Sequence, residues 1–241
     1  MPSMSRKCCR RLRKYCRRWF CVLGVAFIAS CVSRTGRFAT ESCKIAGTVQ
    51  AAAYGVVRII GDSCLDGQGV QQAIASELGT VVVNCARSGA SLGGVAGQTA
   101  CSSDPACRWS VLGGGRNGPG LAQQSPLDAM SMLAIRERAA GKRVIIVGYP
   151  PDAATVDPNS SINSFQDSYI ELVDNKNIFM YDPRLDPRLN YSDPASRSYR
   201  GFDDSHPSEL CRVLMGNAIA SLIRNHSVSH VDPSGLARAS P

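Results

Sequence analysis

Histidine is scarce in this chain of 241 residues, which contains only three. Two of them, His226 and His230, fall in a polar C-terminal segment with little periodicity, which predicts a disordered tail. The sequence also lacks a Cys-x-x-Cys pair or any other Cys/His spacing typical of zinc sites. These absences leave His206 as almost the only candidate for a general base, and they imply no metal or organic cofactor.

Acidic residues are missing from the N-terminal segment. Residues 1–31 hold no Asp or Glu but contain eight of the 27 Lys and Arg residues. The other 19 basic residues balance the 19 acidic ones, so the formal net charge of +8 belongs to the N-terminus. Because the rest of the chain is neutral, the composition gives no indication of a nucleic-acid partner.

The basic segment leads into a short apolar stretch from Trp19 to Ala29. This combination is typical of a secretory signal, and the stretch is shorter than the roughly 20 residues of a membrane span. Residues 28–31, Ile-Ala-Ser-Cys, resemble the lipobox of bacterial lipoproteins, in which the cysteine is lipidated. We expect an exported protein that is periplasmic, secreted, or attached to a membrane through its N-terminus or a lipidated Cys31. The alternative is an ordinary cleavage nearby that leaves Cys31 unmodified.

Six cysteines follow Cys31, and an even number in an exported protein permits three disulfides. They are Cys43, Cys64, Cys85, Cys101, Cys107 and Cys211. The short spacing favours Cys101–Cys107 as a local pair, and the other pairings stay open. Alternatively, Cys64, Cys85 and Cys211 are small buried apolar residues.

Apolar, β-branched runs alternate with helical patterns along most of the chain. Strands are expected at 56–60, 80–84, 109–112, 143–147 and 177–180, helices at 65–78, 127–140, 162–173 and 207–224, and a glycine-rich loop at 89–97. Helices of this length between strands imply β-α-β crossovers and a parallel sheet. We therefore predict an α/β domain over 54–224, a three-layer α/β/α sandwich with about five parallel strands. A linker or N-terminal arm over 32–53 precedes it, and a disordered tail over 225–241 follows it.

Four short blocks stand in one order along this domain. They are Gly61-Asp62-Ser63, Ser88-Gly89-Ala90, Gly115-Arg116-Asn117 and Asp203-Asp204-Ser205-His206. The first follows a predicted strand, where open α/β sheets carry their chemistry. The last supplies an acid and a base three residues apart. A serine, a histidine and an aspartate are the groups that make a neutral hydroxyl nucleophilic.

The ordered blocks, together with Gly148-Tyr149-Pro150 after the fourth strand, resemble the SGNH (GDSL-type) hydrolase superfamily. The resemblance covers about residues 56–224. It implies a flavodoxin-like strand order and hydrolysis of carboxylic esters through an acyl-enzyme intermediate. A small ester or an acylated glycan would be the substrate, and no cofactor would be needed.

The resemblance also assigns roles to individual residues. Ser63 would be the nucleophile, His206 the general base and Asp203 the acid that orients the imidazole. The oxyanion would be held by the backbone N–H groups of Ser63 and Gly89 and by the side-chain amide of Asn117. Glycine suits position 89 because a side chain there could block the approach of the substrate carbonyl.

Each assignment has an alternative. Ser63 could cap the following helix, Asn117 could serve a left-handed turn, and Asp204 could replace Asp203. The third block departs from the family pattern, which reads Gly-x-Asn-Asp, because Gly118 follows Asn117. Arg116 is then either an insertion or the residue at the position of the functional Asn.

Two other functions fit the same residues. One is a polysaccharide O-acyltransferase of the same fold, in which a sugar hydroxyl replaces water as the acceptor. The other is a catalytically inactive lipoprotein that binds the cell envelope, which the altered third block would explain.

Overall fold

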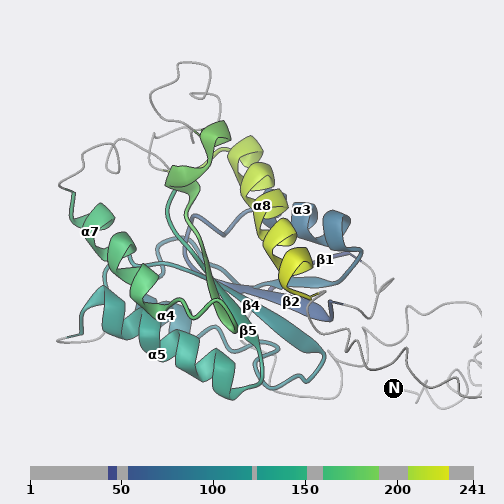
Figure 1. The fold of residues 1–241 in the computed structure, drawn as a ribbon, viewed down its shortest axis with the longest axis horizontal. Helices are drawn as coiled ribbons and strands as arrows, with labels where there is room; N and C mark the ends of the chain where they lie inside the picture. The colour runs from purple at the N-terminus through teal and green to yellow at the C-terminus, as the bar shows by residue number, and fades with distance from the viewer. Residues whose placement is uncertain (1–42, 48–53, 121–123, 151–159, 190–205, 228–241) are drawn as a thin grey trace, which may run out of the picture. The chain divides into compact units, whose positions relative to one another are not determined.

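The apolar runs of the chain form one twisted sheet, which the computed structural model describes for residues 43–47, 54–120, 124–150, 160–189 and 206–227 (Figure 1). The strands are β1 (Lys44–Ala46), β2 (Val56–Ile60), β3 (Val82–Asn84), β4 (Cys107–Gly113), β5 (Arg143–Val147) and β6 (Ile178–Tyr181). Their order in the sheet is β1-β3-β2-β4-β5-β6. The five strands from β2 to β6 are parallel, and their order is the flavodoxin-like one.

Helices cover both faces of the sheet and complete the three layers. They are α3 (Gln68–Leu78), α4 (Leu92–Ala96), α5 (Pro126–Ala139), α7 (Ser161–Ser168) and α8 (Glu209–Ser227), with short 3-10 turns η2 (Tyr169–Leu172), η3 (Pro183–Leu185) and η4 (Pro187–Leu189). Figure 1 shows α3 and α8 on one face and α4, α5 and α7 on the other. The predicted α/β three-layer sandwich is therefore confirmed.

Side chains of the buried strand β2 point alternately to the two helical layers on either face of the sheet. Val57 and Ile59 belong to the apolar core beneath α3 and α8. Arg58 points to the other face, where it meets Glu137 of α5. Successive side chains of a strand point to opposite faces, so a charged residue can occur within a buried apolar run.

The N-terminal arm and the glycine-rich loop each hold an element that the sequence did not predict. Lys44–Ala46 form an edge strand, β1, antiparallel to β3. Leu92–Ala96 form the short helix α4, which begins after Ser91, whose hydroxyl accepts a hydrogen bond from the Gly94 amide. Helical spacing is hard to recognise in five residues that include two glycines.

The start of the predicted tail was also wrong, because α8 continues to Ser227. The imidazole of His226 stacks on Phe179 with ring centroids 4.0 Å apart. Its backbone carbonyl accepts a hydrogen bond from the Arg143 guanidinium. Residues 228–241, with His230, lie outside the described residues.

The predicted local disulfide was wrong as well. No disulfide joins Cys101 to Cys107, and the bond joins Cys43 to Cys85 across 42 positions. Cys107 is buried at the start of β4, and this burial raises the pKa of its thiol to about 12. The bonded pair fastens the segment before β1 to the end of β3. Sequence spacing could not reveal this pairing, because the antiparallel edge strand that creates it was not predicted.

Among the described residues, no helix is long and apolar enough to span a membrane. The apolar segment at Trp19–Ala29 lies outside this part of the chain, so its function stays a prediction.

Candidate active site

Three of the four sequence blocks follow neighbouring parallel strands. Gly61–Ser63 come after β2, Ser88–Ala90 after β3, and Gly115–Asn117 after β4. β2 and β4 are neighbours, but the connection after β2 runs to β3 on one side and the connection after β4 runs to β5 on the other. Such a switch point is where open α/β sheets form a crevice for a ligand.

Ser63 sits in a tight turn between β2 and α3. The amides of Leu65 and Asp66 donate to the Asp62 carbonyl at 3.2 and 3.0 Å, which closes the turn around the serine. The helix begins only at Gln68, with Gly67 as its N-cap. Ser63 is therefore not the cap of α3, and this alternative interpretation is wrong. Its side chain is buried, at 5% relative exposure.

A glutamine that no motif indicated holds the strand end before this turn. Gln98 follows α4 and is almost fully buried. Its Oε1 accepts from the Gly61 amide at 2.8 Å, and its Nε2 donates to the Gly61 carbonyl at 2.9 Å. Gln98 thus satisfies both backbone groups of Gly61, as a neighbouring strand would.

Buried charges lie directly beneath Gln98. The Arg58 guanidinium donates to the Gln98 carbonyl and, at 2.6 Å, to Glu137 Oε2. The Ser110 hydroxyl donates to the same carboxylate at 2.8 Å. Burial alone would raise the pKa of Glu137, but Arg58 and these hydrogen bonds hold it below its usual range. The ion pair is fully buried, and its hydrogen bonds offset part of the desolvation, while Arg58 Nε has no hydrogen-bond partner among the described residues.

Asp62 links the first block to the third. Its carboxylate accepts hydrogen bonds from the Cys64 amide at 3.1 Å and from the Tyr149 hydroxyl. The same hydroxyl accepts from the Arg116 amide at 2.8 Å. Burial raises the pKa of Asp62, while its hydrogen bonds and the charges of Arg116 and His206 counteract that rise. The side chains of Arg116 and His206 therefore lie within electrostatic range of the residue before Ser63.

The second block is bonded to the first. The Arg87 amide donates to the Gly61 carbonyl at 3.0 Å, and the Ser88 amide donates to Asp66 Oδ2 at 2.8 Å. Gly89 adopts a positive φ of 76°, and a Cβ added there would meet nothing within 4 Å. Glycine is thus required by the left-handed backbone, while open space lies where a side chain would project.

The third block forms a turn in which the Gly118 amide donates to the Gly115 carbonyl at 2.9 Å. The exposed Asn117 side chain donates from Nδ2 to the carbonyl of Ala90 at 3.2 Å, beside Gly89. A primary amide has two N–H donors, so one remains for another acceptor. This contact places the side-chain amide of Asn117 next to the second block.

The fourth block is described only at its end. His206 is exposed and lies three residues before α8, whereas Asp203 and Asp204 lie outside the described residues. In the first turn of α8, Arg212 Nη2 donates to the Ser63 carbonyl at 3.1 Å. The helix that follows the histidine is therefore bonded directly to the backbone of Ser63. His226 lies at the opposite end of α8, about 26 Å from Glu209 at 1.5 Å per residue.

Two glycines allow α8 to come so close. A Cβ added at Gly67 would lie 2.1 Å from the Cδ of Arg212, and one at Gly69 would lie 2.9 Å from the Glu209 carbonyl oxygen. The Gly-x-Gly spacing of Gly67 and Gly69 can be read from the sequence. It follows a turn and not a strand, so it does not resemble the glycine motif of a nucleotide-binding loop. Gln98 and Arg212 carry no local sequence signal, since their partners are distant in the chain.

In the part of the chain that the structure describes, no cluster of three His, Cys, Asp or Glu side chains could hold a metal ion. The groups that meet at this edge are a hydroxyl, an imidazole and several N–H donors. This donor set suits acyl transfer by a nucleophilic serine.

Comparison with solved structures identifies the architecture. A lipase/acylhydrolase from Enterococcus faecalis superposes with a TM-score of 0.55 at 17% identity, over 71% of this chain and 96% of that one. A putative SGNH hydrolase from Slackia heliotrinireducens gives 0.56 at 18% identity, over 70% and 98%. The chain has the SGNH hydrolase fold.

Further SGNH-fold neighbours include proteins named for action on acetylated sugars. A variant of an acetyl xylan esterase from Geobacillus stearothermophilus superposes with a TM-score of 0.53 at 17% identity, over 70% of this chain and 94% of that one. No protein-family model matches the sequence, and no curated protein matches it. The SGNH fold is thus evident from the structure, at a sequence identity that supports the fold alone.

Proposed function

We propose that this chain is a serine hydrolase that cleaves carboxylic esters. The observation that carries the proposal is the hydrogen-bonded union of three sequence blocks around Ser63. Asp62 reaches Arg116 through the Tyr149 hydroxyl, and Asn117 reaches Ala90 directly. A nucleophile surrounded by N–H donors from separate loops is the arrangement that acyl transfer needs.

In this mechanism the Ser63 Oγ attacks the ester carbonyl while His206 takes the hydroxyl proton. The oxyanion accepts hydrogen bonds from the amides of Ser63 and Gly89 and from the free N–H of Asn117. The tetrahedral intermediate collapses, the C–O bond to the alcohol breaks, and His206 returns the proton to the departing alkoxide. Water then repeats the sequence, with His206 again as base, and releases the acid.

Asp203 is the acid proposed to orient His206 and to stabilise its charged form. The anchoring of α8 to Ser63 supports the pairing of His206 with the serine, because it fixes the start of the helix beside the nucleophile's backbone. Asn117, which contacts the second block, is the preferred amide donor over Arg116, whose amide faces Tyr149.

Two measurements on the full chain test the proposal. A fluorophosphonate probe should form a covalent adduct at Ser63, located by mass spectrometry of the digested protein. Hydrolysis of p-nitrophenyl acetate should be lost in Ser63→Ala and retained in Ser221→Ala, which changes a serine in the middle of α8. No adduct, together with equal rates in the wild type and Ser63→Ala, would reject the proposal and favour an inactive binding protein.

We also propose that the protein is exported. The support is the basic and apolar segment at residues 1–31 together with the Cys43–Cys85 disulfide, since stable disulfides belong to oxidising compartments. Mass spectrometry of the mature N-terminus would test it. A lipidated Cys31 would indicate membrane attachment, a new N-terminus nearby would indicate cleavage, and an intact cytoplasmic chain would contradict export.

A further inference from the structure

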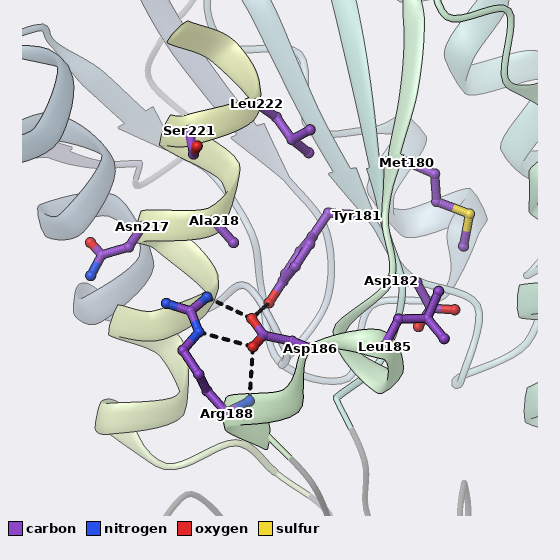
Figure 2. Close-up of a pocket in the computed structure, with 10 residues that line it drawn as sticks. All are labelled: Met180, Tyr181, Asp182, Leu185, Asp186, Arg188, Asn217, Ala218, Ser221 and Leu222. Carbon is purple, nitrogen blue, oxygen red and sulfur yellow. Dashed lines mark hydrogen bonds and ion pairs between the residues drawn. The ribbon is translucent and has the colours of Figure 1, made fainter. Parts of the chain in front are cut away.

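Two cavities in the described part of the chain differ in their relation to the candidate active site. One lies between β6 and the middle of α8 (Figure 2), and its charged groups are already paired. Asp186 accepts from Arg188 at 2.9 Å and from the Tyr181 hydroxyl at 3.0 Å. Its described lining residues include none from the four blocks. The other cavity begins at the third block itself.

This second cavity, the α7 groove, has a volume of about 720 Å³. Its walls are the third-block turn, the start of α5 and one side of α7. The lining residues are Gly115, Arg116, Gly118, Ser125, Pro126, Leu127, Ser161, Ile162, Ser164, Phe165 and Ser168. The volume lies within the usual range of small-molecule sites. Because the groove starts at the turn that carries Asn117, a bound ester would extend from Ser63 into it.

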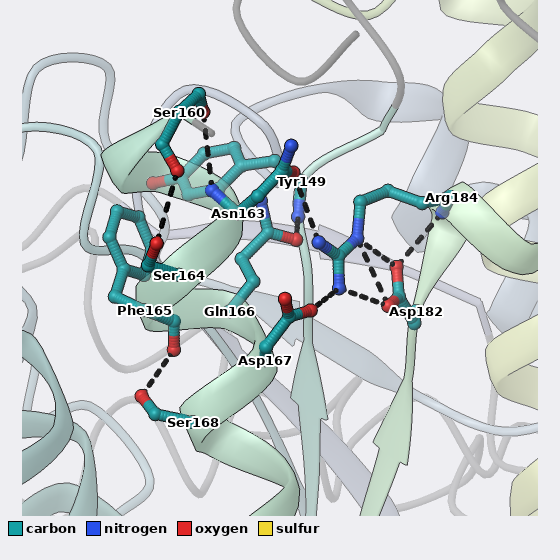
Figure 3. Close-up of polar contacts among 10 residues, drawn as sticks. All are labelled: Tyr149, Ser160, Asn163, Ser164, Phe165, Gln166, Asp167, Ser168, Asp182 and Arg184. Atoms are coloured by element: carbon teal, nitrogen blue, oxygen red, sulfur yellow. Dashed lines mark hydrogen bonds and ion pairs between the residues drawn. The ribbon is translucent and has the colours of Figure 1, made fainter. Parts of the chain in front are cut away.

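The side of α7 that faces the groove is separate from the side that stabilises the fold. Asp167 on the other side forms an ion pair with Arg184 at 2.7 Å, and Asn163 accepts a hydrogen bond from the same guanidinium at 3.0 Å. Figure 3 shows Ser164 and Ser168 on the side of the helix away from Arg184. The groove-side serines are thus not needed to hold α7 in place.

Three of the hydroxyl groups that line the groove donate their protons within the protein, and one of them, Ser164 Oγ, donates to the Ser160 carbonyl at 3.4 Å. Ser168 Oγ donates to the Phe165 carbonyl at 2.6 Å, and Ser125 Oγ donates to Asp128 Oδ2 at 2.7 Å. A hydroxyl whose proton is engaged can offer only acceptor lone pairs to a ligand. The groove therefore suits a ligand that brings its own O–H donors.

The groove also has apolar surface. The Phe165 ring is held edge-on by Tyr149, with centroids 6.3 Å apart, and Leu127 and Ile162 lie nearby in the lining. Among the described lining residues none is a carboxylate, and Arg116 is the one cation. A ligand with both hydroxyl donors and C–H faces matches this mixture of acceptor oxygens and apolar carbon.

Two other ester classes match less well. A long acyl chain has no donors, and it would remove the serine oxygens from water without replacing their hydrogen bonds. A phosphate or carboxylate group is acceptor-only, so it gains nothing from hydroxyls whose protons are engaged, and Arg116 alone would attract it. A sugar satisfies the hydroxyl oxygens and covers the ring and aliphatic side chains.

We propose that the α7 groove binds the sugar part of an acylated glycan, with the scissile ester at Ser63 and a sugar ring against Phe165. This inference rests on the proposed esterase function. It makes Ser164 and Phe165 specificity-determining residues that act on the alcohol part of the substrate and not on the acyl group.

The experiment compares kcat/KM for partly acetylated xylotetraose, p-nitrophenyl acetate and p-nitrophenyl octanoate. Ser164→Trp fills the groove from an exposed position, so it is expected to fold. It should lower the ratio of xylotetraose-acetate to p-nitrophenyl acetate activity by about tenfold or more, a loss of about 1.4 kcal/mol in relative transition-state binding. Phe165→Leu should lower the same ratio. Ser221→Trp, which fills the cavity of Figure 2, should leave the ratio unchanged.

Binding without turnover separates this inference from the esterase proposal. Saturation-transfer NMR on the Ser63→Ala variant should detect deacetylated xylotetraose, and Ser164→Trp should remove the signal. Hydrolysis of p-nitrophenyl acetate without any binding of the oligosaccharide would overturn the groove proposal and leave the esterase intact. A selective loss of octanoate activity in Ser164→Trp would also overturn it, in favour of an acyl-chain site. Sugar binding by a protein that the fluorophosphonate does not label would overturn only the esterase.

Discussion

The two halves of the candidate site are built differently. The nucleophile half, around Ser63, lies at a strand end and is held from several directions, by Gln98, by Tyr149 through Asp62, and by Arg212. The base half consists of an exposed histidine three residues before α8, the helix whose Arg212 donates to the Ser63 carbonyl. We infer that several hydrogen bonds fix the position of the Ser63 hydroxyl and its N–H donors. The position of the His206 imidazole depends on α8.

The largest expected effect tests whether the halves act as one unit. Ser63→Ala and His206→Ala should each lower kcat for p-nitrophenyl acetate by roughly 10⁴–10⁶-fold, and the double variant should be no worse than either one. The reason is that neither group performs nucleophilic attack without the other. Steady-state kinetics on the three variants measures this, and additive losses would show that His206 is not the base for Ser63.

A second prediction removes the charge network beneath the nucleophile half. Glu137→Gln leaves Arg58 buried without its counter-charge, so the free energy of unfolding should fall by roughly 3–5 kcal/mol at neutral pH. Denaturant titration would measure the loss. Glu171→Gln, which changes an exposed acid, is the control, and its free energy of unfolding should change little.

The same variant has a defined pH dependence. The pKa of Glu137 is lowered in the folded state, so its contribution is complete above the ordinary glutamate value and is lost as the pH falls through the lowered folded value. The stability difference between wild type and Glu137→Gln should therefore shrink on acidification. A difference that stays constant down to pH 2 would mean that folding does not lower the pKa of Glu137.

A third prediction decides which residue of the third block serves the oxyanion. Asn117→Ala should lower kcat by roughly 10²–10³-fold with little change in KM, because one oxyanion donor is lost. Arg116→Ala should have the smaller effect on p-nitrophenyl acetate, since its backbone amide, which contacts Tyr149, is unchanged. The opposite ranking would show that the arginine occupies the functional position.

The smallest expected effect concerns the link through Gln98. Gln98→Leu removes both hydrogen bonds to Gly61, and we expect a decrease of about tenfold in kcat with KM unchanged, because the turn before Ser63 is less constrained. Gln98→Glu keeps the acceptor and should recover part of the rate. Gln72→Leu, on the exposed side of α3, is the matched control. If Gln98→Leu, Gln98→Glu and Gln72→Leu all lower kcat to the same extent and all lower the melting temperature to the same extent, the role of Gln98 is purely structural.

Local sequence patterns predicted the elements whose periodicity is strong. The strands at Val56–Ile60 and Arg143–Val147 were found with their observed bounds, because both are continuous β-branched runs beside turn residues. The first block was expected after a strand, and the structure brings it together with the second and third blocks. Patterns of this kind report which residues are buried, and burial is what fixes the sheet.

Contacts between distant segments could not be predicted in this way. Strand β1 is three residues long and is defined by its pairing with β3, and Cys43 finds Cys85 only because of that pairing. Gln98 is an ordinary glutamine in the sequence, and its role depends on the position of Gly61, 37 residues away. Such features arise from tertiary packing, which a single sequence does not display.

The Cys43–Cys85 bond has a mechanical consequence when the N-terminal segment of this chain is tethered. Tension on that segment enters the domain at Cys43 and passes through a covalent bond to the end of β3, next to the loop of Gly89. The edge strand therefore cannot be peeled away from its neighbour under load while the disulfide is intact. A reducing environment would remove this reinforcement, and the anchor point would then depend on three residues of β-pairing.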